Sequence, residues 1–103
     1  MIRARFTVHR GRPTGFSVVG HSDAAQSGKD IVCAAVTSAV MLTANTISDV
    51  VKCGATVTVG DNSVTLAGCG SAEEQMILQG LLLHLQTLAQ QNPANIKVII
   101  TEE

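Results

Sequence analysis

The sequence predicts an α+β fold, a two-layer sandwich in which two helices pack on a mixed or antiparallel sheet. Three observations support this prediction. The 103 residues allow one domain and no more. Five short stretches alternate apolar with polar residues or end at turn residues, as strands do. Two longer stretches have the apolar periodicity of helices. Their order along residues 1–103 is β-β-α-β-β-α-β, which is typical of a single two-layer domain.

The strand predictions depend on alternation and on turn residues. In the first stretch, IRARFTV, apolar side chains alternate with two arginines and a threonine, which indicates one buried face and one wet face. A turn over residues 9–14 contains Gly11 and Pro13, and Gly60-Asp61-Asn62 joins a second hairpin. We expect strands at residues 2–8, 15–20, 55–59, 63–67 and 96–101.

The helix predictions depend on start and stop signals. The first helix should begin near Ser27 or Gly28 and run to about Lys52, with Gly54 as its stop. Its apolar residues surround much of its circumference, so it should be largely buried. The second helix should follow the capping box Ser71-Ala72-Glu73-Glu74 and end near Gln91, just before Asn92-Pro93.

Composition limits the classes of partner. Apolar residues make up 46% of the chain and only two residues are aromatic, so the core must be mainly aliphatic. The net charge of −1 argues against strong direct binding to nucleic acid. Four of the seven basic residues nevertheless gather near the start. They form either a solvated strand face or a local attraction for an anionic partner: Arg3, Arg5, Arg10 and Arg12.

Targeting signals are not evident in the sequence. The first residues form an alternating strand with arginines instead of the apolar core of a signal peptide, and no run of 18 apolar residues occurs. We therefore expect no membrane segment and a cytoplasmic location. The three cysteines should then be reduced thiols and not a disulfide framework.

The candidate site is the stretch from Gly20 to Ser38, GHSDAAQSGKDIVCAAVTS. Cys33 lies near the expected helix start, with Asp30 and Thr37 on the same helical face. His21 lies in the preceding small, polar loop, with Gly20 and Gly28 as natural hinges. Taken alone, Cys33 is either a small core residue or a thiol nucleophile that has His21 as its base.

Other candidate sites are weaker. Cys53 and Cys69 stand eight residues on either side of Asp61 and could face each other across the hairpin, but two reduced thiols are the better interpretation. His9 and His84 complete no zinc-ligand spacing, and His84 should be a half-buried structural residue. We expect no metal and no cofactor.

The stretch GHSDAAQSGKDIVCAAVTS resembles the signature of the ribosomal-processing cysteine proteases, the Prp family. The order of elements and the length of the chain are also similar. The resemblance implies a single cysteine protease domain that acts as a homodimer. Its substrate would be the short N-terminal extension of the large-subunit ribosomal protein L27, removed during ribosome maturation.

The resemblance also implies the roles of individual residues. Cys33 would be the nucleophile and His21 the general base. The loop from Gly20 to Gly28 would order over the substrate, and Asp30 and Ser38 would support the site. Backbone N–H groups at the helix start are candidate donors to the oxyanion.

Two alternative functions remain open. One is a non-catalytic ribosome-assembly module that uses the N-terminal arginines to bind ribosomal RNA or protein, which predicts salt-sensitive binding. The other is a thiol redox protein that pairs Cys33 with Cys53 or Cys69, which predicts a reversible disulfide. We favour the protease, because only that function explains the histidine and the cysteine together.

Overall fold

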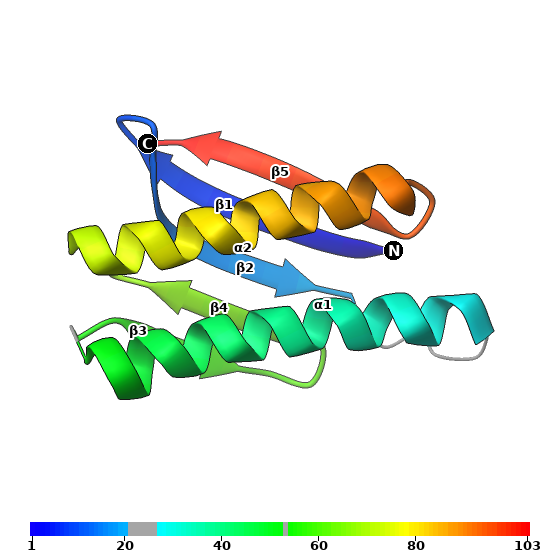
Figure 1. Ribbon diagram of the computed structural model, residues 1–103, viewed down its shortest axis with the longest axis horizontal. Coiled ribbons are helices and arrows are strands. Elements are labelled where there is room, and N and C mark those ends of the chain that lie inside the picture. Colours follow the sequence, from blue (N-terminus) through cyan, green and yellow to red (C-terminus); the bar gives the residue numbers. More distant parts are fainter. Residues whose placement is uncertain (21–26, 53) are drawn as a thin grey trace.

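The computed structural model describes residues 1–20, 27–52 and 54–103, and side chains within the first helix from Ile31 onward. The predicted order β-β-α-β-β-α-β is confirmed, with one additional π-helical turn after the first helix (Figure 1). The elements are β1 Ile2–His9, β2 Arg12–Val19, α1 Ser27–Asn45, η1 Thr46–Val51, β3 Thr56–Val59, β4 Ser63–Ala67, α2 Ala72–Gln91 and β5 Ile96–Glu102.

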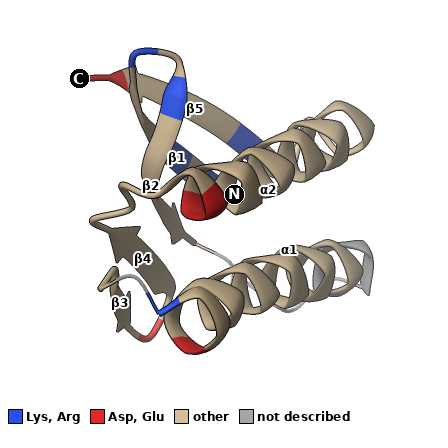
Figure 2. Cartoon of the chain, turned by 60° about the vertical axis from the view of Figure 1, so that its left-hand side comes forward, with Lys and Arg blue, Asp and Glu red and all other residues tan. Residues whose placement is uncertain are grey.

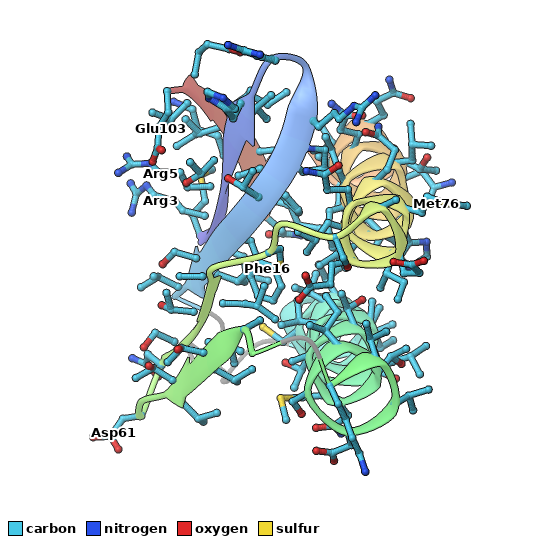
Figure 3. The ribbon with its side chains drawn as sticks, turned by 90° about the vertical axis from the view of Figure 1, so that its left-hand side faces the viewer. Arg3, Arg5, Phe16, Asp61, Met76 and Glu103 are labelled. Carbon is cyan, nitrogen blue, oxygen red and sulfur yellow. The ribbon has the colours of Figure 1, made fainter. Side chains whose placement is uncertain are left out.

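The five strands form one mixed sheet in the order β3-β4-β2-β1-β5. Three of the pairings are antiparallel, and β1 pairs with β5 in parallel. A parallel pair needs a crossover connection, and α2 provides the last part of it. Both helices lie on the same side of the sheet, so the opposite sheet face has no helix over it (Figures 1 and 3).

The first hairpin is tighter than predicted. Arg10 and Gly11 both have positive φ, 52° and 78°, which is the backbone of a two-residue turn that matches the twist of the strands. Strand β2 therefore begins at Arg12, and the expectation of a turn extending to residue 14 was wrong. Pro13 lies inside the strand, where the pairing register shifts beside Thr7 and Val8. A proline is tolerated there because an irregular position needs no ladder hydrogen bond.

The first helix ends two residues before the predicted stop. The N–H of Lys52 donates to the carbonyl of Ile47 at 3.0 Å, a π-type bond, and Lys52 itself adopts the left-handed conformation. Gly54 also has a positive φ of 83°, but it follows the helix end and does not form it. The window Ile31–Val51 is long and apolar enough to cross a membrane by length and composition, with a mean hydropathy of 1.7. Core helices pass the same test, and this one packs on the sheet along one side; only 33% of the window is buried, so the expectation of a largely buried helix was wrong.

The core lies between the sheet and the helices. Phe6 and Phe16 from the two central strands stand opposite each other, with ring centroids 6.0 Å apart. Aliphatic side chains surround them, including Val36, Ile47 and Leu78. The predicted aliphatic core is thus confirmed, with both aromatic residues at its centre.

The start of α2 contains a buried carboxylate. The predicted capping box is confirmed: the backbone N–H of Glu74 donates to the Ser71 hydroxyl, and Glu74 Oε1 accepts from the N–H groups of Ser71 and Gly70. Glu74 is only 1% exposed. Burial raises the pKa of this carboxyl, but the hydrogen bonds from Ser71, Gly70 and the Cys69 thiol outweigh burial and hold its pKa below the ordinary value of 4.5.

We predict that Glu74→Gln makes unfolding less dependent on pH. A lowered folded-state pKa contributes stability above the unfolded-state pKa, and this contribution is lost as pH falls through the folded-state value. Glutamine keeps the capping geometry but cannot ionise. The difference in unfolding free energy between wild type and variant, measured by urea titration, should therefore shrink between pH 7 and pH 3.

The matched control is Glu73→Gln, the same change on the exposed neighbouring side chain. If the Glu74 difference stays constant over this range, the buried carboxylate is not the source of the pH dependence.

Candidate active site

The segment before α1 leaves the sheet at a tightly held glycine. Gly20 has a φ of +93°, and its N–H donates to the carbonyl of Asn62 at 3.0 Å. A Cβ at this position would lie 2.5 Å from the carbonyl oxygen of Met1. Both the backbone conformation and the close approach therefore require glycine. Gly20 fixes the point and direction from which the chain continues to His21.

Cys33 lies on the inner side of α1. It is partly buried and packs against the core cluster to which Val32 and Val36 also belong. Cys33 is the seventh residue of α1, which puts it at the end of the second turn. The stabilisation of an anion by a helix N-terminus falls off within the first turn. The expected support of a Cys33 thiolate by the helix start is therefore small.

The direction of the Cys33 side chain brings its thiol closer to the helix start than its position in the second turn suggests. In an α-helix each Cα–Cβ bond tilts toward the N-terminus. The first four N–H groups of a helix, here those of residues 27–30, have no partner within the helix. The Cys33 side chain is thus directed toward the turn that carries these donors, and toward the position of Asp30.

Ser38 does not share a face with Cys33. Five residues along a helix correspond to a rotation of about 140°. Ser38 is exposed and lines a groove of about 620 Å³ between α1 and α2, together with Leu42 and His84. Cys33 is not among the residues that line this groove. The structure therefore separates these two predicted site residues.

The structure describes the remaining predicted site residues only in part. His21 and Cys53 lie outside the described residues, as does the loop over residues 21–26. Asp30 lies in α1, three residues before Cys33, and its side chain is also outside the described part. The expected pairing of His21 with Cys33 remains a prediction.

Cys69 occupies a different environment from Cys33. It is 3% exposed, its N–H donates to the carbonyl of Thr14 at 3.1 Å, and its thiol hydrogen-bonds to the Glu74 carboxylate. This thiol is part of the junction between β4 and α2. A substrate cannot reach it without disrupting that junction.

Neither of the two described histidines lies in a group of side chains that could bind a metal ion. His84 is exposed on α2, so the expectation that it is half-buried was wrong. His9 is exposed, with Nδ1 3.3 Å from the carbonyl of Glu103. Within the described ranges, no three His, Cys, Asp or Glu side chains are grouped to hold a metal ion.

Comparison with known proteins shows which class of protein has this sequence pattern and fold. The chain is 29% identical to a ribosomal processing cysteine protease of Staphylococcus aureus, over 95% of this chain and 97% of that protein. A crystal structure of an S. aureus ribosomal processing protease with a substrate peptide superposes with a TM-score of 0.88 at 26% identity, covering 98% of this chain and all of that one. A Streptococcus mutans protein at 23% identity has the same fold, with a TM-score of 0.88 and coverage of 100% and 96%.

These similarities define a cysteine protease built as two helices on a five-stranded mixed sheet. The family model of cysteine protease Prp matches residues 1–97. The chain therefore belongs to the Prp family of cysteine proteases.

Proposed function

We propose that this protease removes the N-terminal extension of ribosomal protein L27, with Cys33 as nucleophile and His21 as general base. One observation carries the proposal. A family member of 27% identity and TM-score 0.86 has been crystallised with a covalently linked product peptide. A covalent product is what nucleophilic catalysis leaves on an enzyme. A protease acting on a ribosomal protein would work in the cytoplasm.

The described thiols support Cys33 over Cys69. The nucleophile must approach a peptide carbonyl, so its sulfur has to be accessible to a substrate. Cys33 is partly exposed in the second turn of α1, close in sequence to the segment that Gly20 anchors. Cys69 is buried and already bonded to Glu74.

The mechanism is acyl transfer. His21 takes the proton from the Cys33 thiol, and the thiolate attacks the scissile carbonyl. N–H groups of the first turn of α1 stabilise the oxyanion, and the proton on His21 passes to the leaving amine. Water then hydrolyses the thioester and releases the N-terminal fragment. Asp30, three residues before Cys33 in the sequence, would orient the imidazolium or a substrate amide in this mechanism.

We predict that Cys33→Ala lowers cleavage of a peptide spanning the extension junction by about 10³-fold or more, because loss of a nucleophile removes the covalent route. Cleavage is measured by chromatography under reducing conditions. Cys69→Ser is the control, since serine keeps a hydrogen-bond donor for Glu74, and it should retain most of the activity.

Full activity in Cys33→Ala would refute the assignment of the nucleophile. Absence of wild-type cleavage under these reducing conditions, together with a reversible disulfide that involves Cys33, would favour the redox alternative. Cleavage of unrelated peptides at the same rate would refute the proposed substrate.

The outer side of the helix layer supports a homodimer. No residue from Ile31 to Ser48 is charged, and α2 has no Asp, Glu, Lys or Arg after Glu74. Figure 2 shows the same pattern, with the charged residues on the sheet and at the helix ends. Ile31 is 75% exposed and Leu42 is 69% exposed. An uncharged surface that exposes large apolar side chains favours an interface, and we propose that a second copy of the chain covers it.

We predict that Leu42→Glu converts a dimer into a monomer, because it would bury an unpaired carboxylate at the interface. Val59→Glu is the matched control, since Val59 is equally apolar, is exposed, and lies on β3 away from the helix groove. Light scattering after gel filtration measures the mass. A monomeric wild type would contradict the dimer, and a dimeric Leu42→Glu variant would contradict this interface.

A further inference from the structure

The face of the sheet opposite the helices is polar and basic. Arg3, Arg5 and Thr7 alternate with the buried residues of β1, so their side chains share this face. Figure 3 shows Arg3 and Arg5 projecting from the sheet away from both helices. In β5, Lys97 stands directly opposite Arg3, and therefore lies on the same face. Lys97 is far from these arginines in the sequence and joins them only through the pairing of β5 with β1.

Three positive charges thus share one face, with one acidic residue, Glu103, which lines the same hollow as Arg5. Arg3 and Lys97 are paired on the adjacent strands β1 and β5. Arg5 follows Arg3 by two residues, about 6.6 Å along β1. No ion pair involves any of the three within the part of the chain that the structure describes. Glu103 projects on the same side at one end of the face (Figure 3). Like charges placed opposite each other destabilise a sheet, so this arrangement is unfavourable for folding alone.

Hydroxyl groups lie on one side of Arg5 and in the next row of the sheet, whereas the other neighbour of Arg5 is Ile99 and that of Arg3 is Val19. Ser17 is opposite Arg5 on β2, and the hydroxyl of Thr65 on β4 donates to the Ser17 oxygen at 3.4 Å. Thr7 and Thr101 are opposite each other in the next row. Arginine, lysine, serine and threonine are the side chains that contact phosphate oxygens in nucleic-acid complexes.

We propose that this face binds the phosphate backbone of RNA. Its charge is complementary to a polyanion, and its hydroxyls match phosphate acceptors. An acidic protein is the less suitable occupant, because protein interfaces depend on buried aromatic or aliphatic anchors. The two aromatic residues, Phe6 and Phe16, are in the core and cannot stack on bases. Binding is therefore weak, salt-sensitive and independent of base sequence, and it does not depend on the proposed protease substrate.

The other arginines near the start of the chain are placed differently. Arg12 lies beside α2 and lines a hollow with Gln75 and Met76, so it is not on the helix-free face. Arg10 lies in the hairpin turn. The four arginines near the start of the chain therefore do not form one surface: Arg3 and Arg5 lie on the helix-free face, and Arg10 and Arg12 do not. Arg10 and Arg12 can serve as a control, because removing them changes the charge equally.

The test compares two triple variants that change the net charge equally. The first is Arg3→Gln with Arg5→Gln and Lys97→Gln. The control is Arg10→Gln with Arg12→Gln and Lys52→Gln, all exposed positions off the face. The probe is a fluorescent RNA hairpin, and anisotropy gives the affinity over a salt series. No peptide substrate is present, so the result is independent of protease activity.

We expect wild type to bind with a slope of log affinity against log salt of about −2 to −3, as three phosphate contacts predict. The first variant should lose tenfold or more in affinity, and the control less than threefold. Thermal unfolding of the first variant should occur at the same or a higher temperature, because a like-charge pair has been removed. Absence of RNA binding by wild type, equal losses in both variants, or equally tight binding of polyglutamate would overturn the proposal.

Discussion

The start of the proposed site depends on the close approach of the Gly20 backbone to the carbonyl of Met1. This contact, together with the hydrogen bond from Gly20 to Asn62, ties the end of β2 to the start of β1 and to the turn between β3 and β4. Two strands and a hairpin turn thereby define where the chain leaves β2 before His21. On the other side of that segment, packing of Val32 and Val36 into the core holds α1 and with it Cys33. Packed elements thus lie in the chain on both sides of the residues that we propose for catalysis.

The two faces of the sandwich have opposite chemistry. The helix layer presents an uncharged, partly apolar outer surface, whereas the helix-free sheet face presents arginine, lysine and hydroxyl groups. A net charge of −1 hides this division, because the acidic residues lie mainly at turns, helix ends and the last strand. The interface proposed for the helix layer and the polyanion-binding surface proposed for the sheet therefore lie on opposite sides of this small domain.

Much of the fold followed from local signals. Alternation in IRARFTV and the capping box at Ser71 are read from neighbouring residues, and both were predicted correctly. The features that the sequence could not predict depend on packing between elements that are distant in the chain. Lys97 joins Arg3 only because β5 pairs in parallel with β1, and the sequence does not specify that pairing. The assignment of Ser38 to the site comes from family resemblance alone; Ser38 lines the groove between α1 and α2, and its supporting role stays a prediction.

The central claim is that Cys33 carries the acyl group of the substrate. The most direct measurement is mass spectrometry of the protein quenched in acid during turnover of the extension peptide, followed by digestion to locate the adduct. The account predicts a thioester of the N-terminal fragment on the peptide that contains Cys33. An adduct on Cys53 or Cys69, or turnover with no covalent adduct at any time, would contradict it.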